Sequence, residues 1–550
     1  MRSVPWRERP AATAFAAYAL TAFGYFGAPL LPHPGRHYIG TPADPQIFIW
    51  SFAWWPHAIV HGLDPFHTSL IWAPTGESLA WRTTTPALAL AFSPLTWLAG
   101  PVISYDVAVI LMPALSAWTA FLLCRHLTGR FWPSLAGGYV FGFSSYMVGQ
   151  LDGHLHMSSV FLLPLVALVT LRYVQGQLDG TGAALRLGPL LAVQLALSYE
   201  VSFTAALALV TALALGWLLV PAARHRIVSF VPAALAGYAF AAVLTAPVVY
   251  YALAHYTSES INDPAGYTTD LLNLVVPTRR TLLGGSWTGT LADHFAGNDS
   301  ERNAYVGIPL ALVFLWFGAR RLRLPGSRFL LAATLAAVIA SFGFWFEADG
   351  EKLFTLPWEH VGYRPLFNNV LPSRLMVFAF LCLAAVLALW AAGERRGWLR
   401  YGLPALVIAS LVPSLQLPFW RTATDVPAFF TGDGVRRCLA RNETVMILPL
   451  AKHGNGMLQQ AVSGFRFRMA DGYVAPDPPS SFLTSPVAGR VAYGQITWPD
   501  LKEFAHEKGV TSVLVEAGQE GPWLEALRPL APPEEVDGEL VYRLDRGRRC

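Results

Sequence analysis

Long stretches without charge constrain this chain more than any other feature of its sequence. Asp, Glu, Lys and Arg are absent from residues 10–35, 83–105, 107–124, 131–151, 153–171, 187–199, 201–223, 227–258, 303–319, 329–346, 375–393 and 401–420. Charged residues make up only 13% of the 550 positions, whereas soluble domains carry about 25%. A helix needs about 20 apolar residues to cross the hydrocarbon core of a bilayer. The sequence therefore predicts an α-helical polytopic membrane protein.

The charges between these stretches predict the orientation of the spans. Arg2, Arg7 and Arg9 precede the first stretch, which indicates a cytoplasmic N-terminus by the positive-inside rule. If 83–105 spans the membrane, Arg125 and Arg130 fall outside. If it is a re-entrant or surface helix, the second span is 104–124 and both arginines lie inside, as do the later arginine clusters. This second arrangement predicts 11 spans in the plasma (inner) membrane and an extracytoplasmic C-terminus.

Two kinds of outer segment follow from this topology. Long outer loops are expected at 36–103, 259–302 and 347–374, and a less apolar region, 421–550, follows the last span. That region holds strand-like runs at 444–450, 511–517 and 540–544, and a helix-like run at 499–509 in which Gly509 is a suitable stop. We expect a transmembrane domain over 1–420 and a small α/β extracytoplasmic domain over 421–550.

The charge balance and the cysteines exclude several classes of function. A net charge of +4 without a basic stripe argues against binding to nucleic acid. The four cysteines show neither metal-ligand spacing nor a disulfide framework. Cys438 and Cys550 could pair only if the C-terminal tail folds back onto the start of the distal region.

The first outer loop begins with an unusual aromatic segment. Asp44-Pro45 is followed by an apolar run that contains three tryptophans and reaches Ile59. Asp suits a helix N-cap and Pro suits the first helical position. We expect a helix that lies on the membrane surface with its tryptophans at the level of the headgroups. Asp64 precedes a second proline and is expected only to cap a turn.

The layout resembles the GT-C superfamily of membrane glycosyltransferases. Its matching features are DPQIFIW at 44–50, WAPTG at 72–76, the apolar run 86–100, CRHLTGR at 124–130 and GFSSYMVGQLDGHLHM at 142–157. The resemblance covers about residues 1–420 and concerns topology and motif placement. It implies transfer of a sugar from a polyprenyl-phosphate donor to a glycan, lipid or protein acceptor on the outer face, with inversion. Membrane lipids are the other expected partners, and nucleic acid is not expected.

Asp44 is the first candidate for the catalytic base. A carboxylate near the interface can take the proton of an acceptor hydroxyl, and the resemblance implies an acid at this place. Its structural alternative is the helix N-cap. Many members of the superfamily have two adjacent acids here, but this chain has Ala43 before Asp44. Whether a divalent metal takes part is therefore left open.

Asp152, His154 and His156 form a second polar cluster at the outer face. They could approach Asp44 and serve as a second acid or base, as acceptor ligands or as metal ligands. The alternative is a polar turn in which Gly153 permits a tight bend. Two histidines two positions apart do not share a helix face, so joint ligation needs a non-helical turn.

Several outer charged residues are candidates for substrate binding. Glu200 lies between two apolar runs, where a carboxylate is usually functional or paired. Arginines in an otherwise acidic outer face, Arg82, Arg279 and Arg280 among them, can bind the donor phosphate. The predicted set is Glu200, Glu301, Arg302, Arg364 and Arg374, together with His154 and His156; the alternative for each arginine is a headgroup anchor or a local ion pair.

Two other functions fit a polytopic chain. A transporter or flippase often shows repeated halves and broken helices at mid-depth, but no such repeat is visible and the spans hold almost no charge. A non-catalytic scaffold of cell-envelope assembly that presents residues 421–550 would leave the polar outer clusters without a task.

Overall fold

The computed structural model describes residues 9–258, 260–474, 482–492, 496–519, 521–544 and 549–550. Two compact units are present. Unit 1 comprises Met1–Leu31, Val107–Val249 and Ser258–Trp420, and unit 2 comprises Pro32–Asp106, Tyr250–Thr257 and Arg421–Cys550. The last change of unit follows Trp420, and the first outer loop, which was predicted to belong to the domain 1–420, groups with residues 421–550 in unit 2. The division into two domains at residue 420 stays a prediction. Arg2 and Arg7, on which the predicted orientation rests, lie outside the described residues.

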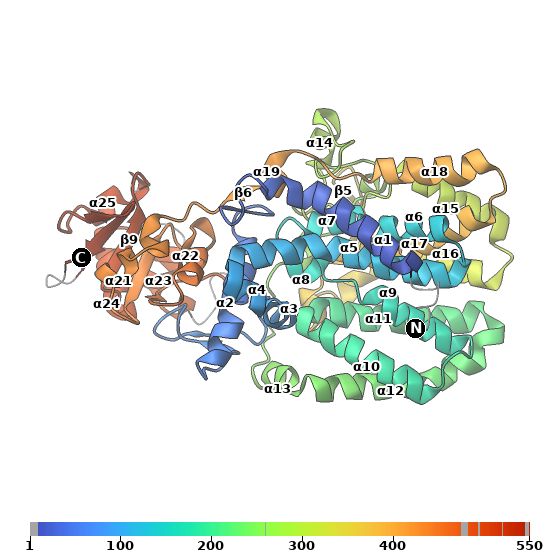
Figure 1. Cartoon of the computed structure of the whole chain (residues 1–550), viewed down its shortest axis with the longest axis horizontal. Helices are drawn as coiled ribbons and strands as arrows, with labels where there is room; N and C mark the ends of the chain where they lie inside the picture. The colour runs from blue at the N-terminus through green and yellow to red at the C-terminus, as the bar shows by residue number, and fades with distance from the viewer. Residues whose placement is uncertain (1–8, 259, 475–481, 493–495, 520, 545–548) are drawn as a thin grey trace, which may run out of the picture. The chain divides into compact units, whose positions relative to one another are not determined.

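Unit 1 is a bundle of apolar helices (Figure 1). Its main members are α1 (Arg9–Ala22), α5 (Pro101–Thr128, from residue 107 on), α6 (Phe131–Gly142), α9 (Leu163–Val174), α10 (Gly180–Leu197), α11 (Tyr199–Leu219), α12 (Arg224–Leu244), α15 (Ile308–Arg321), α16 (Pro325–Ser341), α17 (Met376–Gly393) and α18 (Gly397–Ser410). Every predicted span corresponds to one of these helices or to a pair of consecutive helices. The short charge-free stretch 187–199 falls mostly in α10, which is longer than the stretch itself.

Seven helical segments in the described part of the chain are long and apolar enough to cross a bilayer. They are Pro10–Leu30, Pro101–Thr128, Leu155–Val174, Gly180–Leu197, Tyr199–Leu219, Pro221–Leu244 and Pro372–Gly393, and Pro325–Ser341 is a shorter apolar helix. The chain is a multi-pass membrane protein. The full count of 11 spans stays a prediction.

Small residues bring neighbouring helices of the bundle close together. α10 packs along α12, and α6 packs against α17, which is buried over most of its length. A Cβ atom at Gly137 in α6 would lie 2.8 Å from the carbonyl oxygen of Ala384 in α17. Close backbone approach of this kind is typical of helices that associate in lipid, because the hydrophobic effect does not drive helices together there.

The ambiguous stretch 83–105 does not form one continuous helix. It contains the short helices α3 (Pro86–Ala91) and α4 (Ser93–Ala99), and α5 then starts at Pro101. Gly100 separates α4 from α5 with a φ of 87°, which a residue with a side chain rarely adopts. This agrees with the arrangement in which the second span begins near residue 104.

Unit 2 contains a mixed five-stranded sheet with the order β10-β11-β9-β7-β8. The strands are β7 (Thr444–Leu448), β8 (Arg468–Met469), β9 (Ser512–Glu516), β10 (Glu534–Val536) and β11 (Glu539–Arg543). β7 pairs in parallel with β8 and β9, and the two remaining pairs are antiparallel. The predicted strand runs are present, and α24 (Trp498–Lys508) stops at Gly509 with φ 68°.

The first outer loop continues this sheet within unit 2. The amide of Met469 donates to the carbonyl of Leu70 over 2.8 Å, and the amide of Ala73 donates to the carbonyl of Met469 over 3.0 Å. A second link pairs β1 (His37–Tyr38) with β6 (Thr422–Ala423) in antiparallel fashion. An exposed sheet edge is thereby covered by chain from a distant part of the sequence.

The aromatic helix α2 (Asp44–Val60) is buried inside unit 2 and does not expose its tryptophans. Trp50, Trp54 and Trp55 are at most 3% exposed. The indole of Trp50 donates to Gln460 Oε1 over 2.7 Å and packs against Phe465. The expectation of tryptophans at headgroup level was therefore wrong, because their apolar surface is buried within unit 2 and the Trp50 indole finds its acceptor in the distal part of the chain.

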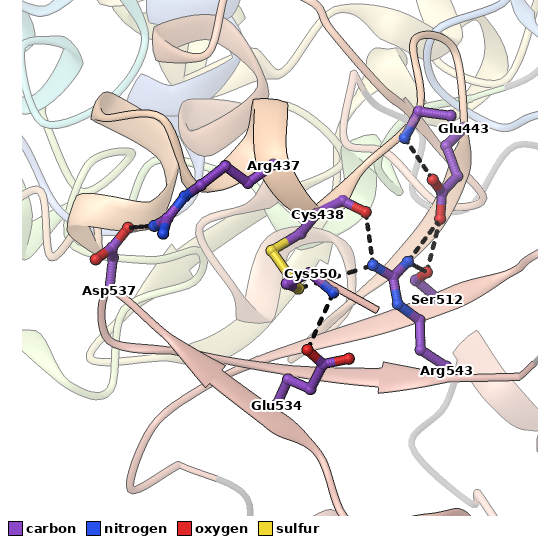
Figure 2. The surroundings of a disulfide bond; sticks show 9 residues. Arg437, Cys438, Glu443, Ser512, Glu534, Asp537, Arg543 and Cys550 are labelled. Atoms are coloured by element: carbon purple, nitrogen blue, oxygen red, sulfur yellow. Dashed lines mark hydrogen bonds and ion pairs between the residues drawn. A yellow bond between two sulfur atoms is a disulfide. The ribbon is translucent and has the colours of Figure 1, made fainter. Parts of the chain in front are cut away.

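A disulfide ties the end of the chain to α21 (Gly434–Cys438) (Figure 2). Cys438 and Cys550 are bonded across 112 positions of sequence. Arg543 donates to the carbonyl of Cys438 over 2.5 Å and forms an ion pair with Glu443 at 3.2 Å. The tail thus folds back onto the start of the distal region, which is the condition that the pairing required.

Removing this cross-link is expected to destabilise unit 2. Closing a loop of this length stabilises a protein by about 2–5 kcal/mol, mainly by restricting the unfolded chain. Cys550→Ser in the full chain should therefore lower the protease concentration at which residues 421–550 are cleaved. Cys382→Ser, which changes a free cysteine of α17, serves as the control. Equal protease resistance of both variants and the parent under non-reducing conditions would contradict a stabilising role.

Candidate active site

The predicted cluster of Asp152, His154 and His156 lies in a tight connection inside unit 1. The short helix α7 (Ser145–Gln150) begins after Ser144, whose hydroxyl accepts a hydrogen bond from the amide of Met147 over 3.2 Å. α8 (Leu155–Ser158) follows, with His154 at its N-cap in a non-helical conformation. The connection is therefore a non-helical turn, which allows Asp152 and the two histidines to point in different directions.

Asp152 forms a buried ion pair with Arg280. Arg280 Nη2 lies 2.5 Å from Asp152 Oδ2, and both residues are 5% exposed. The guanidinium also lies 4.2 Å from the ring centroid of Phe419. Its Nε and Nη1 atoms are buried and have no hydrogen-bond partner among the described residues. A buried guanidinium with unused donors is suited to bind an anion.

Burial makes Asp152 a weaker acid than a free aspartate. It raises the pKa of Asp152 to about 6, against the opposing effects of Arg280 and His154. A carboxylate with a pKa close to neutral can both take up and release a proton under physiological conditions.

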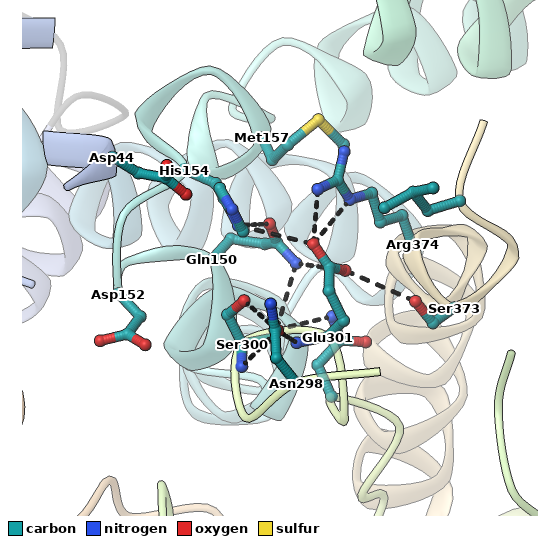
Figure 3. A network of polar contacts seen from close by, with 12 residues as sticks. Asp44, Gln150, Asp152, His154, Met157, Asn298, Ser300, Glu301, Ser373 and Arg374 are labelled. Carbon is teal, nitrogen blue, oxygen red and sulfur yellow. Dashed lines mark hydrogen bonds and ion pairs between the residues drawn. The ribbon is translucent and has the colours of Figure 1, made fainter. Parts of the chain in front are cut away.

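A second cluster joins Glu301, Arg374 and Glu200 (Figure 3 shows the first two). Arg374 donates to Glu301 Oε1 through Nε at 2.9 Å and through Nη2 at 2.5 Å, and to Glu200 Oε2 through Nη1 at 2.6 Å. Glu301 and Arg374 are 2% and 8% exposed. The local ion pair that was the alternative for Arg374 is thus present, and Glu200 is paired as expected for a carboxylate beside the membrane.

His154 connects the turn at residues 152–156, called the DGHLH turn after its sequence, to this second cluster. Its Nδ1 lies 3.0 Å from Gln150 Oε1 and 3.5 Å from Glu301 Oε1. Gln150 in turn donates to Glu301 Oε2 over 3.2 Å. Burial alone would raise the pKa of Glu301, but Arg374 and His154 outweigh it and lower that pKa. Glu301 is therefore ionised, while Asp152 titrates near neutrality.

The loop that carries Glu301 is held in place by local hydrogen bonds. Asn298 Oδ1 accepts from the amides of Ser300 and Glu301 over 3.1 and 3.2 Å (Figure 3). Gly149 allows this loop to pack on α7, since a Cβ atom there would lie 2.4 Å from the carbonyl oxygen of Ser300. The glycine beside the DGHLH motif thus has a packing role that sets the position of Glu301.

Two predicted arginines lie apart from these buried clusters. Arg302 has intermediate exposure, donates to the carbonyl of Phe295 over 3.0 Å and lies 3.4 Å from both Asp293 and Asp299. Arg364 is exposed in the connection between β5 (Glu351–Thr355) and α17.

Asp44 belongs to unit 2, where it is the first residue of α2. The preceding residue, Ala43, has a φ of 85° and holds the N-cap position. The structural alternative for Asp44 was the helix N-cap, but Ala43 holds that position, and the Asp44 carboxylate accepts a hydrogen bond from the hydroxyl of Tyr473. Its predicted approach to Asp152 stays a prediction. Asp64 does cap a turn as expected, accepting from the amide of Phe66 over 2.9 Å.

Among the described residues, no group of three or more His, Cys, Asp or Glu side chains is arranged to hold a metal ion.

Sequence reasoning did not select Gln150 and Ser373 for the site. Arg280 was considered only together with Arg279, among the outer arginines that could bind the donor phosphate. Ser373 lies 3.5 Å from Glu301 Oε2 and precedes Arg374. Neither spacing nor composition links Arg280 and Ser373 to residues 150–154, so only the folded chain brings them together.

Comparison with solved structures shows a common fold. The oligosaccharyltransferase of Archaeoglobus fulgidus in the apo form superposes with a TM-score of 0.55 and 12% identity, over 98% of this chain and 74% of that chain. The archaeal oligosaccharyltransferase AglB from the same organism, in complex with an inhibitory peptide and a dolichol-phosphate, gives 0.51 and 11%, over 98% and 75%. ArnT from Cupriavidus metallidurans bound to undecaprenyl phosphate gives 0.52 and 10%, over 98% of both chains.

These identities show the fold alone, and that fold is GT-C-like, as the sequence predicted. A search of curated proteins finds no match. A protein-family profile described as Domain of unknown function (DUF6311) matches residues 14–417, which is more than half of the chain. The chain therefore belongs to the DUF6311 family.

Proposed function

We propose that this protein is a membrane glycosyltransferase that moves a sugar from a polyprenyl-phosphate donor to an acceptor on the extracytoplasmic face. The observation that carries the proposal is the pair of buried charge clusters around the DGHLH turn. Ionisable groups lie at one end of apolar helices in both clusters. The first cluster pairs Asp152 with Arg280, and the second pairs Arg374 with Glu301 and Glu200. Placing ionisable groups beside a membrane costs free energy, and those found there usually have a function.

The solved relatives support the choice of donor. The ArnT structure contains undecaprenyl phosphate, and the AglB structure contains a dolichol-phosphate. Both ligands are polyprenyl phosphates. For the present chain we infer a lipid carrier of the same chemical class, with the sugar and the acceptor open among glycans, lipids and proteins.

Asp152 is proposed as the catalytic base. Its carboxylate would take the proton of the acceptor hydroxyl, whose oxygen would attack the anomeric carbon of the donor. The bond from that carbon to the phosphate oxygen breaks, so the configuration inverts and polyprenyl phosphate leaves with the electron pair. Arg280 offers the N–H groups of its unpartnered Nε and Nη1 atoms to the developing negative charge.

Asp44 is retained as a second proposed catalytic residue, held by the Tyr473 hydroxyl. We assign substrate binding to His154, His156, Glu200, Glu301, Arg302, Arg364 and Arg374. Arg364 is exposed and suits a direct contact with donor or acceptor. Arg374 and Glu301 already satisfy each other and suit positioning of His154.

We further propose that the chain has 11 spans, a cytoplasmic N-terminus and an extracytoplasmic distal region in the plasma (inner) membrane. The Cys438–Cys550 bond supports the placement of the distal region, because disulfides persist in oxidising compartments and are rare in the cytosol.

The direct test measures release of polyprenyl phosphate by the purified protein from a panel of polyprenyl-phosphate sugars, with cell-envelope extract as acceptor. We expect turnover by the parent and its loss in Asp44→Asn if Asp44 acts chemically. Asp64→Asn is a matched control, since Asp64 also precedes a proline in unit 2 but caps a turn. Equal turnover in Asp44→Asn and Asp64→Asn would remove Asp44 from the chemistry. No turnover with any donor by folded protein would overturn the proposal.

Activity is expected to fall below about pH 6. The base must be ionised, and burial raises the pKa of Asp152 to about 6, so kcat/KM should drop about tenfold per unit of pH below that value. Arg280 lowers this pKa, and Arg280→Gln should therefore move the acid limb of the pH profile to higher pH. An acid limb that keeps its position in Arg280→Gln would argue against Asp152 as the titrating base.

A further inference from the structure

A groove in unit 1 lies among α1, α6 and α18. It encloses about 260 Å³, and its lining includes Ala17, Trp132, Tyr139, Arg400, Ala405 and Ile408. α6 starts at Phe131 and leads through α7 to the DGHLH turn. The start of α6, and with it Trp132, therefore lies at the end of the bundle opposite to Asp152. The groove is not part of the candidate active site.

One end of the groove is basic. Arg400 is half-buried, and its Nε is buried without a hydrogen-bond partner among the described residues. Its guanidinium lies 5.4 Å from the ring centroid of Tyr401. Arg396 and Arg130, which precede α18 and α6, are exposed. The nearby acid Glu394 is already engaged by Arg320 at 3.4 Å and by the amides of Arg395 and Arg396.

The remainder of the groove is apolar and follows the helices into the bundle. Arg400 and Ile408 are eight positions apart on α18, which corresponds to about 12 Å along the helix axis. Ala17 and Ala405 are exposed, so small side chains leave the wall open to the outside. Trp132 is 61% exposed at the start of α6, a position typical of the headgroup level.

We propose that this groove binds one anionic phospholipid, with its phosphate on Arg400 and part of an acyl chain along Ala405 and Ile408. The free donor of Arg400 and the exposed arginines favour a negative headgroup. The apolar continuation favours a lipid over a free phosphate. Basic pockets between membrane helices are known to bind such headgroups, and this site acts independently of sugar transfer.

The test compares binding of phosphatidylglycerol and phosphatidylcholine to the purified full chain in neutral detergent by native mass spectrometry. We expect the parent to prefer phosphatidylglycerol, and Arg400→Ala to reduce that preference about fivefold. Arg328→Ala removes an exposed arginine from the first turn of α16 and should leave the preference intact. Ala405→Trp fills the open wall and should reduce binding of both lipids.

Retention of the full preference in Arg400→Ala would overturn the proposal. So would unchanged lipid binding in Ala405→Trp, provided that its melting temperature matches the parent and so shows that it is folded. Undecaprenyl phosphate is the competing occupant. If it binds in an Arg400-dependent manner while phosphatidylglycerol does not bind, the groove belongs to the carrier lipid and the assignment to a phospholipid is wrong.

Discussion

Asp152→Asn is expected to reduce turnover of the proposed donor by about 10²- to 10⁴-fold, the usual contribution of a positioned general base. The substitution keeps the size of the side chain and an oxygen that can accept from Arg280, but it cannot take up a proton. The measurement is release of polyprenyl phosphate under single-turnover conditions, which separates chemistry from product release.

A loss of folding stability could imitate this result, because Asp152→Asn leaves Arg280 as a buried cation without a counter-charge. Breaking a buried pair in this way destabilises a protein by about 3–5 kcal/mol. The double variant Asp152→Asn with Arg280→Gln removes both charges and resolves the ambiguity. Because Arg280 is itself assigned to the developing charge, turnover of the double variant is compared with that of Arg280→Gln alone. If Asp152 is the base, the double variant should be folded and far less active than Arg280→Gln; equal turnover of the two would assign the loss in Asp152→Asn to instability. Parent-like turnover of Asp152→Asn would remove Asp152 from the mechanism.

Arg374→Met is expected to destabilise unit 1 by about 3–5 kcal/mol. Arg374 is the counter-charge of both Glu301 and Glu200, whose carboxylates lie 2.5 and 2.6 Å from its guanidinium. Methionine has a similar length but no charge, so both acids would have to be buried alone or protonated. The measurement is the midpoint of thermal unfolding of the purified chain in detergent.

Arg364→Met provides the matched control, since Arg364 is exposed and its removal leaves no buried charge. Adding Glu200→Gln to Arg374→Met should recover part of the stability, because one of the two stranded carboxylates is neutralised. An unfolding midpoint of Arg374→Met equal to that of Arg364→Met would show that the Glu301–Arg374–Glu200 cluster adds little to stability.

Most helices of unit 1 were predictable because their signal is local. A segment in lipid must satisfy its backbone hydrogen bonds within itself, so a charge-free stretch is sufficient to predict a helix. β7, β9 and β11 were predictable for the same reason, because each is a short run of mainly apolar residues, and so was the end of α24 at Gly509, whose φ is 68°. The turn at Asp152 was also visible, because polar residues interrupt two apolar stretches at a defined position.

The partners of these residues were decided only by the tertiary structure. Asp152 meets Arg280 across 128 positions, and Glu301 meets Arg374 across 73. Which arginine meets which acid depends on helix packing, through close approaches such as that of Gly149 to Ser300.

The same limit explains the error over α2. By itself, a helix with three tryptophans after an apolar segment reads as an interfacial helix. In the folded chain, Gln460 and Phe465 satisfy Trp50 from more than four hundred positions away. Apolar surface is buried by whichever partner the fold brings to it. The sequence by itself therefore determined that α2 would be a helix, and only the tertiary structure decided that it would be buried in unit 2.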